Sequence, residues 1–172
     1  MVVPCMRFVA SLVAVLMLLA LAAFAASANA RGGSPRLDRA ERGVIRAINR
    51  QRAAAGLGHV RASARLNRAA DFHSREMLYG NYFAHPSLNG SPMERRVRRF
   101  AHRRAVGETL AMLGGRCHRH MGGRVVSMWM NSGSHRAVLL SSRFKRIGVA
   151  RRGGRLGGGR ACMVTADFAS RR

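Results

Sequence analysis

Residues 105–113 read Ala-Val-Gly-Glu-Thr-Leu-Ala-Met-Leu, a short apolar run interrupted by one charged residue, Glu108. This length and composition predict a strand that is buried in a sheet. A carboxylate among Val106, Leu110 and Met112 loses its hydration on folding, so it needs a cation, a metal ion or hydrogen-bond donors beside it. We therefore expect Glu108 to lie at a functional site, with partners from other parts of the chain.

Two histidines in polar segments are the candidate partners. His85 stands before Pro86, which favours an extended backbone and predicts a loop over residues 82–86. His135 lies in a polar turn at residues 131–136. Each imidazole can be a protonated partner of the carboxylate or a neutral metal ligand beside it. The alternative, that both only bond the loop backbone, stays open on the pattern alone.

Helices are predicted on both sides of this strand. Helical spacing of apolar residues predicts one helix from Leu37 to Gly56 and a second from Ser63 to Tyr79. In the second helix, His73 is interpreted as a core residue. The segment Ser91-Pro92-Met93-Glu94 predicts a capping box that opens a third helix, with Met93, Val97 and Phe100 as its buried stripe.

The end of the chain completes the sheet. A fourth helix is predicted over residues 121–131, followed by two strands at residues 147–150 and 161–165 with a glycine- and arginine-rich turn at 152–160. Helices first and an antiparallel pair last predict helices packed on a small sheet.

The N-terminus predicts export. Arg7 is its only charged residue, residues 8–26 are apolar, and Ala28-Asn29-Ala30 is a typical cleavage site, so residues 1–30 are interpreted as a signal peptide. An uncleaved membrane anchor is the alternative, because about 18 apolar residues can span a bilayer. After cleavage we expect no stable membrane span. The hypothesis is a secreted or cell-envelope protein with a flexible lead-in at residues 31–37 and one domain at residues 38–170.

Cysteine content and charge limit the function further. Cys5 leaves with the signal peptide, so Cys117 and Cys162 are predicted to form a disulfide in an oxidising compartment. The formal charge is +24, and among 31 basic residues only Lys145 is a lysine. Such a charge favours anionic polymers and surfaces. Because the arginines are scattered and aromatic residues are few, nucleic acid is not expected as a specific partner.

An ordered series of motifs resembles the secreted CAP domains of bacteria (cysteine-rich secretory, antigen 5, pathogenesis-related 1), over about residues 40–168. The series is Asn49-Arg50-Gln51-Arg52, Gly56-Leu57, Ala70-Asp71-Phe72-His73-Ser74-Arg75-Glu76-Met77, Tyr82-Phe83-Ala84-His85, Gly90-Ser91-Pro92, Gly107-Glu108, Trp129-Met130-Asn131-Ser132-Gly133-Ser134-His135-Arg136 and Ile147-Gly148-Val149.

The resemblance implies an α+β fold, a three-layer α-β-α sandwich with a small central antiparallel sheet, and a cleft where histidines and acidic residues converge. His85, Glu108 and His135 match the family's cleft motifs. Thr109 stands where the family has Asn, and Ser134 stands where it has Gly. The second acid of the animal and plant members has no clear counterpart, although Asp167 is a candidate. These departures bear on the cleft chemistry more than on the fold.

Three functions are compatible with these residues. The favoured hypothesis is a non-enzymatic extracellular module that binds a lipid, a cell-envelope component or a protein, with a cleft able to hold zinc or another divalent cation at His85 and His135. A lipid groove would need residues such as Leu78, Met93, Val97 and Met112. The second is a metal-dependent hydrolase of peptide or wall polymer, with Glu108 as general base. The third is a cationic binder of anionic polymers.

Overall fold

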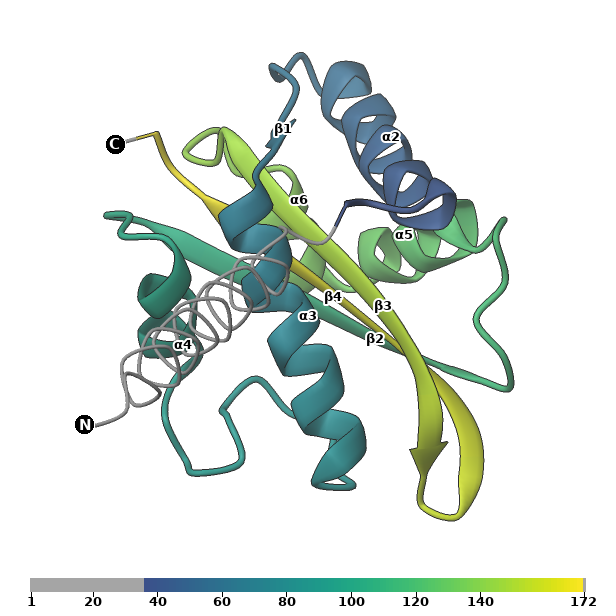
Figure 1. Ribbon diagram of the computed structural model, residues 1–172. Helices are drawn as coiled ribbons and strands as arrows, with labels where there is room; N and C mark the ends of the chain where they lie inside the picture. The colour runs from purple at the N-terminus through teal and green to yellow at the C-terminus, as the bar shows by residue number, and fades with distance from the viewer. Residues whose placement is uncertain (1–35, 172) are drawn as a thin grey trace, which may run out of the picture. The chain divides into compact units, whose positions relative to one another are not determined.

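A four-stranded sheet forms the middle layer of the computed structural model, which describes residues 36–171. The predicted signal peptide at residues 1–30, and the predicted lead-in as far as residue 35, lie outside the described residues. Along the chain the elements are α2 (Arg39–Ala54), β1 (Arg61–Ala62), α3 (Ala64–Tyr79), α4 (Met93–Phe100), β2 (Val106–Gly114), α5 (Gly122–Asn131), α6 (Gly133–Leu139), β3 (Arg146–Leu156) and β4 (Gly159–Ala169) (Figure 1).

The strand order is β1-β3-β4-β2, which makes β2 an edge strand. β2 pairs antiparallel with β4, and β4 pairs antiparallel with β3. Only the two-residue β1 runs parallel to its neighbour, β3. The predicted antiparallel sheet is therefore confirmed, with one short parallel strand added at its other edge.

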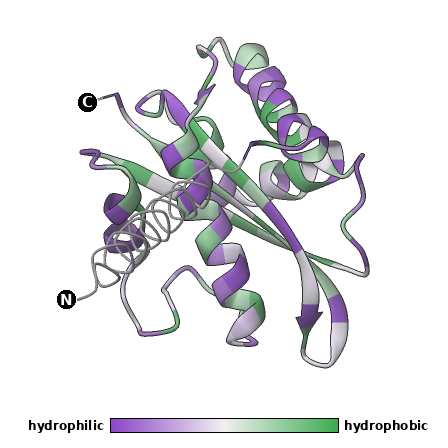
Figure 2. Cartoon of the chain, in the orientation of Figure 1, coloured by the Kyte–Doolittle hydropathy of each residue, from purple (hydrophilic) through white to green (hydrophobic). Residues whose placement is uncertain are grey.

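Helices cover both faces of the sheet, because successive residues of a strand point to opposite sides. Cys162, Val164, Ala166 and Phe168 of β4 face α2, α5 and α6 and form the main core with them. On the other face, Leu110 and Met163 pack with Met77 of α3, and Ala169 packs with Leu66 of α3 and Val97 of α4. Figures 1 and 2 show the helices on the two sides of the strands and the apolar residues concentrated along the strands. The predicted α-β-α sandwich is confirmed.

A glycine on β3 lets α3 approach the sheet closely. A Cβ atom added at Gly148 would lie 2.1 Å from the backbone carbonyl carbon of Leu66. No side chain fits in that space, so α3 lies directly on the strand. The same register joins Gly148 to Asp167 of β4 and Asp167 to Glu108 of β2, so α3 covers both acids.

Three local predictions were wrong. The polar turn expected at residues 131–136 is instead mostly the first part of α6, which carries His135. The expected capping box at Ser91 is not formed: Pro92 is the N-cap of α4 and no side-chain cap bond is present there. A capping box instead opens α2, where Asp38 and Glu41 exchange bonds of 2.8 Å with each other's backbone N–H. The turn expected at residues 152–160 is much tighter, because Gly157 and Gly158 alone connect β3 to β4 with φ of 56° and 81°.

A buried arginine ties α2 to the end of α6. Arg52 has 0% relative exposure, and its guanidinium donates to the carbonyl oxygens of Gly58 (2.9 Å), Leu139 (2.7 Å), Ser141 (2.9 Å) and Phe144 (3.3 Å). Leu139 is the last residue of α6, so Arg52 satisfies a carbonyl that has no partner within its helix. Burial lowers the pKa of Arg52.

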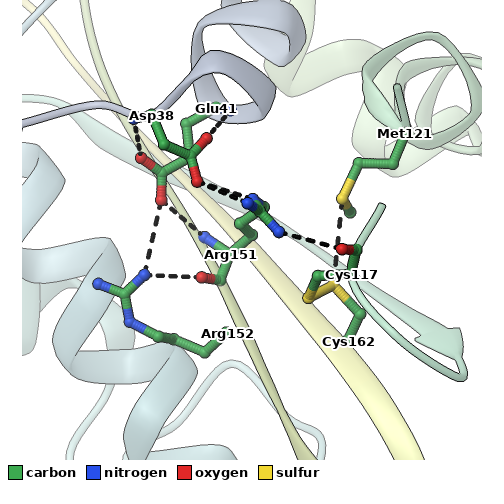
Figure 3. Close-up of a disulfide and its surroundings, with 7 residues drawn as sticks. All are labelled: Asp38, Glu41, Cys117, Met121, Arg151, Arg152 and Cys162. Atoms are coloured by element: carbon green, nitrogen blue, oxygen red, sulfur yellow. Dashed lines mark hydrogen bonds and ion pairs between the residues drawn. A yellow bond between two sulfur atoms is a disulfide. The ribbon is translucent and has the colours of Figure 1, made fainter. Parts of the chain in front are cut away.

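The predicted disulfide is present. Cys117 and Cys162 are joined with a Cα–Cα distance of 5.0 Å, which attaches the segment between β2 and α5 to β4. Arg151 reinforces this attachment: its guanidinium donates to the Cys117 carbonyl oxygen (3.3 Å) and to the Asp38 carboxylate (2.8 Å), as Figure 3 shows. The segment 115–121 is thus fixed to both the sheet and the start of α2.

Candidate functional site

Glu108 is buried on β2 with a partner on each carboxylate oxygen. Its side chain has no exposed surface. His85 Nδ1 donates to Oε1 over 2.8 Å, and the Arg96 guanidinium donates to Oε2. Burial raises the pKa of Glu108, but the His85 hydrogen bond and the positive charge of Arg96 outweigh it, so the pKa lies below its ordinary value. The donors that the sequence required for this carboxylate are therefore present.

Arg96 is a site residue that the sequence analysis missed. It is 1% exposed, and besides Glu108 it donates to the His85 carbonyl oxygen (2.8 Å) and to Ser87 Oγ (3.2 Å). It therefore fixes the loop that carries His85. A signal existed, because Arg96 lies three residues after Met93 and four before Phe100, on the apolar side of the helix.

A second hydrogen-bonded group holds the base of the same loop. His73 of α3 is fully buried, and its Nδ1 contacts Glu76 Oε2 (3.0 Å) while its Nε2 contacts the Ala84 carbonyl oxygen (2.9 Å). Glu76 also accepts from the Tyr82 hydroxyl (2.9 Å) and from the Leu88 N–H (3.2 Å). Burial lowers the pKa of His73 against the attraction of the nearby carboxylates. These bonds fix both ends of the loop on α3.

Asp167 lies beneath this site, directly across from Glu108 on the neighbouring strand. It has 0% exposure, and neither of its carboxyl oxygens has a hydrogen-bond partner among the described residues. Burial raises the pKa of Asp167 well above its ordinary value, and the negative charge of Glu108 raises it further. Burial therefore favours the protonated form of Asp167. Because its side chain cannot touch a ligand from solvent, it acts on the surface only through Glu108.

His135 meets His85 at the surface. The two ring centroids are 6.5 Å apart, although His135 comes from α6 and His85 from the loop before α4. The Glu108 hydrogen bond raises the pKa of His85, whereas burial and the neighbouring His85 charge lower the pKa of His135. His85 is therefore the more readily protonated of the two imidazoles.

The donor set allows only a partial metal site. Because His85 uses Nδ1 for Glu108, its Nε2 is the nitrogen left for a ligand, and the carboxylate orients the ring as it does for ligating histidines. His135 supplies a second imidazole. Among residues 36–171, no group of three or more His, Cys, Asp or Glu side chains is arranged to hold a metal ion. A divalent ion here would have two protein ligands and several open positions.

The structure thus brings all four predicted site residues, His85, Glu108, His135 and Asp167, into one region with two layers. The histidines are on the surface and the acids are beneath them. Four further histidines, His59, His102, His118 and His120, are exposed.

The lipid groove suggested by the sequence needs a correction. Val97 is 0% exposed because it packs on Leu66 and Ala169 in the core, so it cannot line a groove. Met112, another predicted lining residue, is 41% exposed. Exposed apolar side chains also lie on the loop that carries His85, where Phe83 is 45% and Leu88 is 54% exposed.

The described residues thus form an α-β-α sandwich that carries paired histidines over a buried carboxylate. The chain belongs to the cysteine-rich secretory protein (CAP) family, whose model matches residues 45–167. A search of curated proteins found no match. In the part of the chain that the structure describes, no helix is both long and apolar enough to cross a membrane.

Three solved structures of bacterial proteins are similar to this chain in fold. An outer surface protein of Borrelia burgdorferi is 20% identical with a TM-score of 0.65, over 81% of this chain and 100% of that one. An extracellular SCP-domain protein of Bacillus anthracis is 25% identical with a TM-score of 0.59, over 76% of this chain and 41% of that one. A cysteine-rich secretory protein of Staphylococcus aureus is 15% identical with a TM-score of 0.56, over 76% and 38%.

Proposed function

We propose that this protein is a secreted, non-enzymatic binding module that captures a cell-envelope component at the pair His85 and His135. The observation that carries the proposal is the state of Glu108: its side chain is fully buried and both of its oxygens are engaged, whereas the His85 side chain is 50% exposed. A general base must reach the proton that it removes. Glu108 is instead built to orient His85 for binding.

The surroundings of the pair support an amphipathic ligand. Two imidazoles supply polar contacts, and Phe83, two residues before His85 on the same loop, is an apolar side chain with 45% exposure. The loop is held by Arg96 and by Glu76, so the site is fixed before a ligand arrives. A rigid site of this kind binds without the cost of ordering its own side chains.

A divalent cation fits the same pair as an auxiliary to binding. His85 Nε2 and His135 would hold it, and Glu108 would keep the His85 ring in the required tautomer. When bound, such an ion supplies positive charge and open coordination positions to an oxygen of the ligand. This arrangement favours zinc, for which imidazole is a preferred ligand.

The first experiment is zinc titration calorimetry on the oxidised protein and on the His85→Ala/His135→Ala double variant. The control is His59→Ala/His102→Ala, which removes two exposed histidines elsewhere. We expect one ion to bind the wild type and the control, and none to bind the cleft-pair variant. Equal binding by all three proteins would show that the pair is not the site.

The same proteins separate binding from hydrolysis. In a hydrolase that uses Glu108 as general base, Glu108→Gln would abolish turnover of peptide or wall polymer and leave zinc binding intact. In the binding module, wild type shows no turnover, and Glu108→Gln weakens zinc binding because the amide no longer selects one His85 tautomer. Zinc-dependent turnover by the wild type would overturn the proposal.

A further inference from the structure

Two hollows on the side of the molecule near the disulfide are lined by arginines. The hairpin hollow, about 410 Å³, lies between the β3–β4 hairpin and the segment after β2, and Arg116, Arg155 and Arg160 line it. The helix hollow, about 230 Å³, lies between α2 and the segment before α5, and Arg39, Arg46, Arg50 and Arg119 line it together with His120. Neither lining contains an Asp or a Glu.

The seven arginines have no carboxylate partner. Within residues 36–171, none of them forms an ion pair, because the acids nearest in sequence are used elsewhere. Asp38 pairs with Arg151, and Glu41 accepts from the Arg151 N–H and caps α2. Positive charge in both hollows is therefore uncompensated.

Like charges also oppose one another within each hollow. Arg155 and Arg160 are direct cross-strand partners on β3 and β4. Arg46 and Arg50 are four residues apart on α2. Both arrangements are destabilising when no anion lies between the side chains. A bound anion would relieve this repulsion at each hollow.

A single segment joins the two hollows. Gly115, Arg116 and Cys117 border the hairpin hollow, and Arg119 and His120 border the helix hollow. Arg119 is three positions after Arg116 in the sequence, so their Cα atoms are at most about 11 Å apart. The disulfide and Arg151 fix this segment, and Figure 1 shows it passing from the hairpin side of the molecule up to α5 beside α2.

Backbone geometry shapes the helix hollow. A Cβ atom at Gly122 would lie 2.7 Å from the backbone carbonyl carbon of Gly43, so α2 and α5 meet at two glycines. Because neither glycine has a side chain, the surface between the two helices is recessed at this contact. Arg39, Arg46 and Arg50 of α2 line one side of the hollow. The hollow is therefore a consequence of the helix packing rather than of mobile surface side chains.

We propose that the two hollows and the segment between them form one binding track for a linear polymer with a phosphate in each repeat. The polymer is recognised through its phosphates, because guanidinium groups match phosphate oxygens in bidentate geometry. Neither lining contains Phe, Tyr or Trp on which a nucleobase could stack. The track thus favours a base-free polymer such as a poly(glycerol phosphate) chain, and it is separate from the histidine pair.

The test is fluorescence anisotropy of a labelled poly(glycerol phosphate) oligomer with the full oxidised protein, as a function of salt. With up to seven phosphate contacts, the slope of log K against log salt is expected between about −3 and −5, a loss of roughly 10²–10³-fold from 50 to 200 mM salt. The track variant is Arg46→Gln/Arg116→Gln/Arg119→Gln.

The matched control removes the same charge from exposed positions outside the arginine-lined hollows, Arg61→Gln/Arg143→Gln/Arg171→Gln. We expect the track variant to bind about tenfold more weakly than the control and to lose about 2 from the slope, at 0.7 per phosphate contact. Equal loss in the two variants would overturn the proposal, because diffuse net charge alone predicts that result.

Two comparison ligands test the class of polymer. Oligodeoxythymidylate with the same number of phosphates is expected to bind no more tightly than the glycerol polymer. Neither hollow is lined by an aromatic side chain on which its bases could stack. Tighter binding of the oligonucleotide would contradict the base-free track. Binding to phosphatidylglycerol vesicles without binding to the soluble oligomer would also overturn it, because the site would then recognise a lipid surface.

Discussion

Replacing Asp167 by Asn tests the buried acid beneath the histidine pair. Because burial and Glu108 raise the pKa of Asp167 in the folded state, the folded protein holds a proton there that the unfolded chain releases above its ordinary pKa of 3.8. The stability contribution of Asp167 therefore falls as pH rises above 3.8, by about 1.4 kcal/mol per pH unit while the folded carboxyl stays protonated. Asn is uncharged at every pH and keeps an N–H donor near Glu108.

The Asp167→Asn variant is therefore expected to become more stable than the wild type as pH rises. At pH 4 the Asp167→Asn variant and the wild type have similar free energies of unfolding. At pH 7 the variant is more stable, by an amount bounded at about 4 kcal/mol, which is the cost of keeping the acid protonated over the 3.2 pH units from 3.8 to 7. The pKa of Glu108 is shifted in both proteins, so to a first approximation its contribution cancels in the difference between their free energies of unfolding.

Urea denaturation at pH 4, 5, 6 and 7, followed by circular dichroism, measures this difference. The exposed Glu94→Gln variant is the control, and its stability should follow the wild type at every pH. A difference between Asp167→Asn and wild type that does not change with pH would refute the reasoning. So would a loss of stability in the variant that is largest at pH 7.

Three further perturbations have definite outcomes. Gly148→Ala forces α3 off the sheet and should cost about 3 kcal/mol or more in urea denaturation, whereas unchanged stability would show that the helix can shift freely. Arg96→Met should cost about 3–5 kcal/mol by leaving Glu108 without its cation, and adding Glu108→Gln should recover much of that loss in a double-mutant cycle. Reduction of Cys117–Cys162, which closes a loop of 45 residues, should cost about 4 kcal/mol in thermal or urea unfolding with and without reductant.

The sequence predicted those parts of the fold that depend on local pattern. Apolar periodicity placed α3 within one residue of its observed start and predicted β2 from an apolar run around one acid. The β3–β4 turn was predicted too long, because Arg151, Arg152 and Arg155 did not read as strand residues. In the structure their backbones pair with β4, while Arg151 and Arg152 find carboxylates of other elements.

The site was predicted only in part, because its chemistry depends on contacts between distant segments. The position of Glu108 in an apolar strand predicted hydrogen-bond donors beside its carboxylate, and His85 is one of these donors. Arg96 was not predicted, because it is one of many arginines, although its spacing from Met93 and Phe100 put it on the apolar side of its helix. The arginine track could not be predicted either. Its residues are scattered from position 39 to position 160, and they come together only when α2, the segment 115–121 and the β3–β4 hairpin pack.

The bonds of Arg52 have a consequence for motion at the histidine pair. They hold α6 at its C-terminal end, at Leu139, while His135 stands near the other end of this seven-residue helix with no hydrogen bond of its own among the described residues. His85, in contrast, is held at its ring by Glu108 and at its carbonyl by Arg96. The His85 ring is therefore held directly by a hydrogen bond, whereas the His135 ring is held only through the position of α6. A ligand that needs a different spacing from the one seen here would move His135 and leave His85 in place.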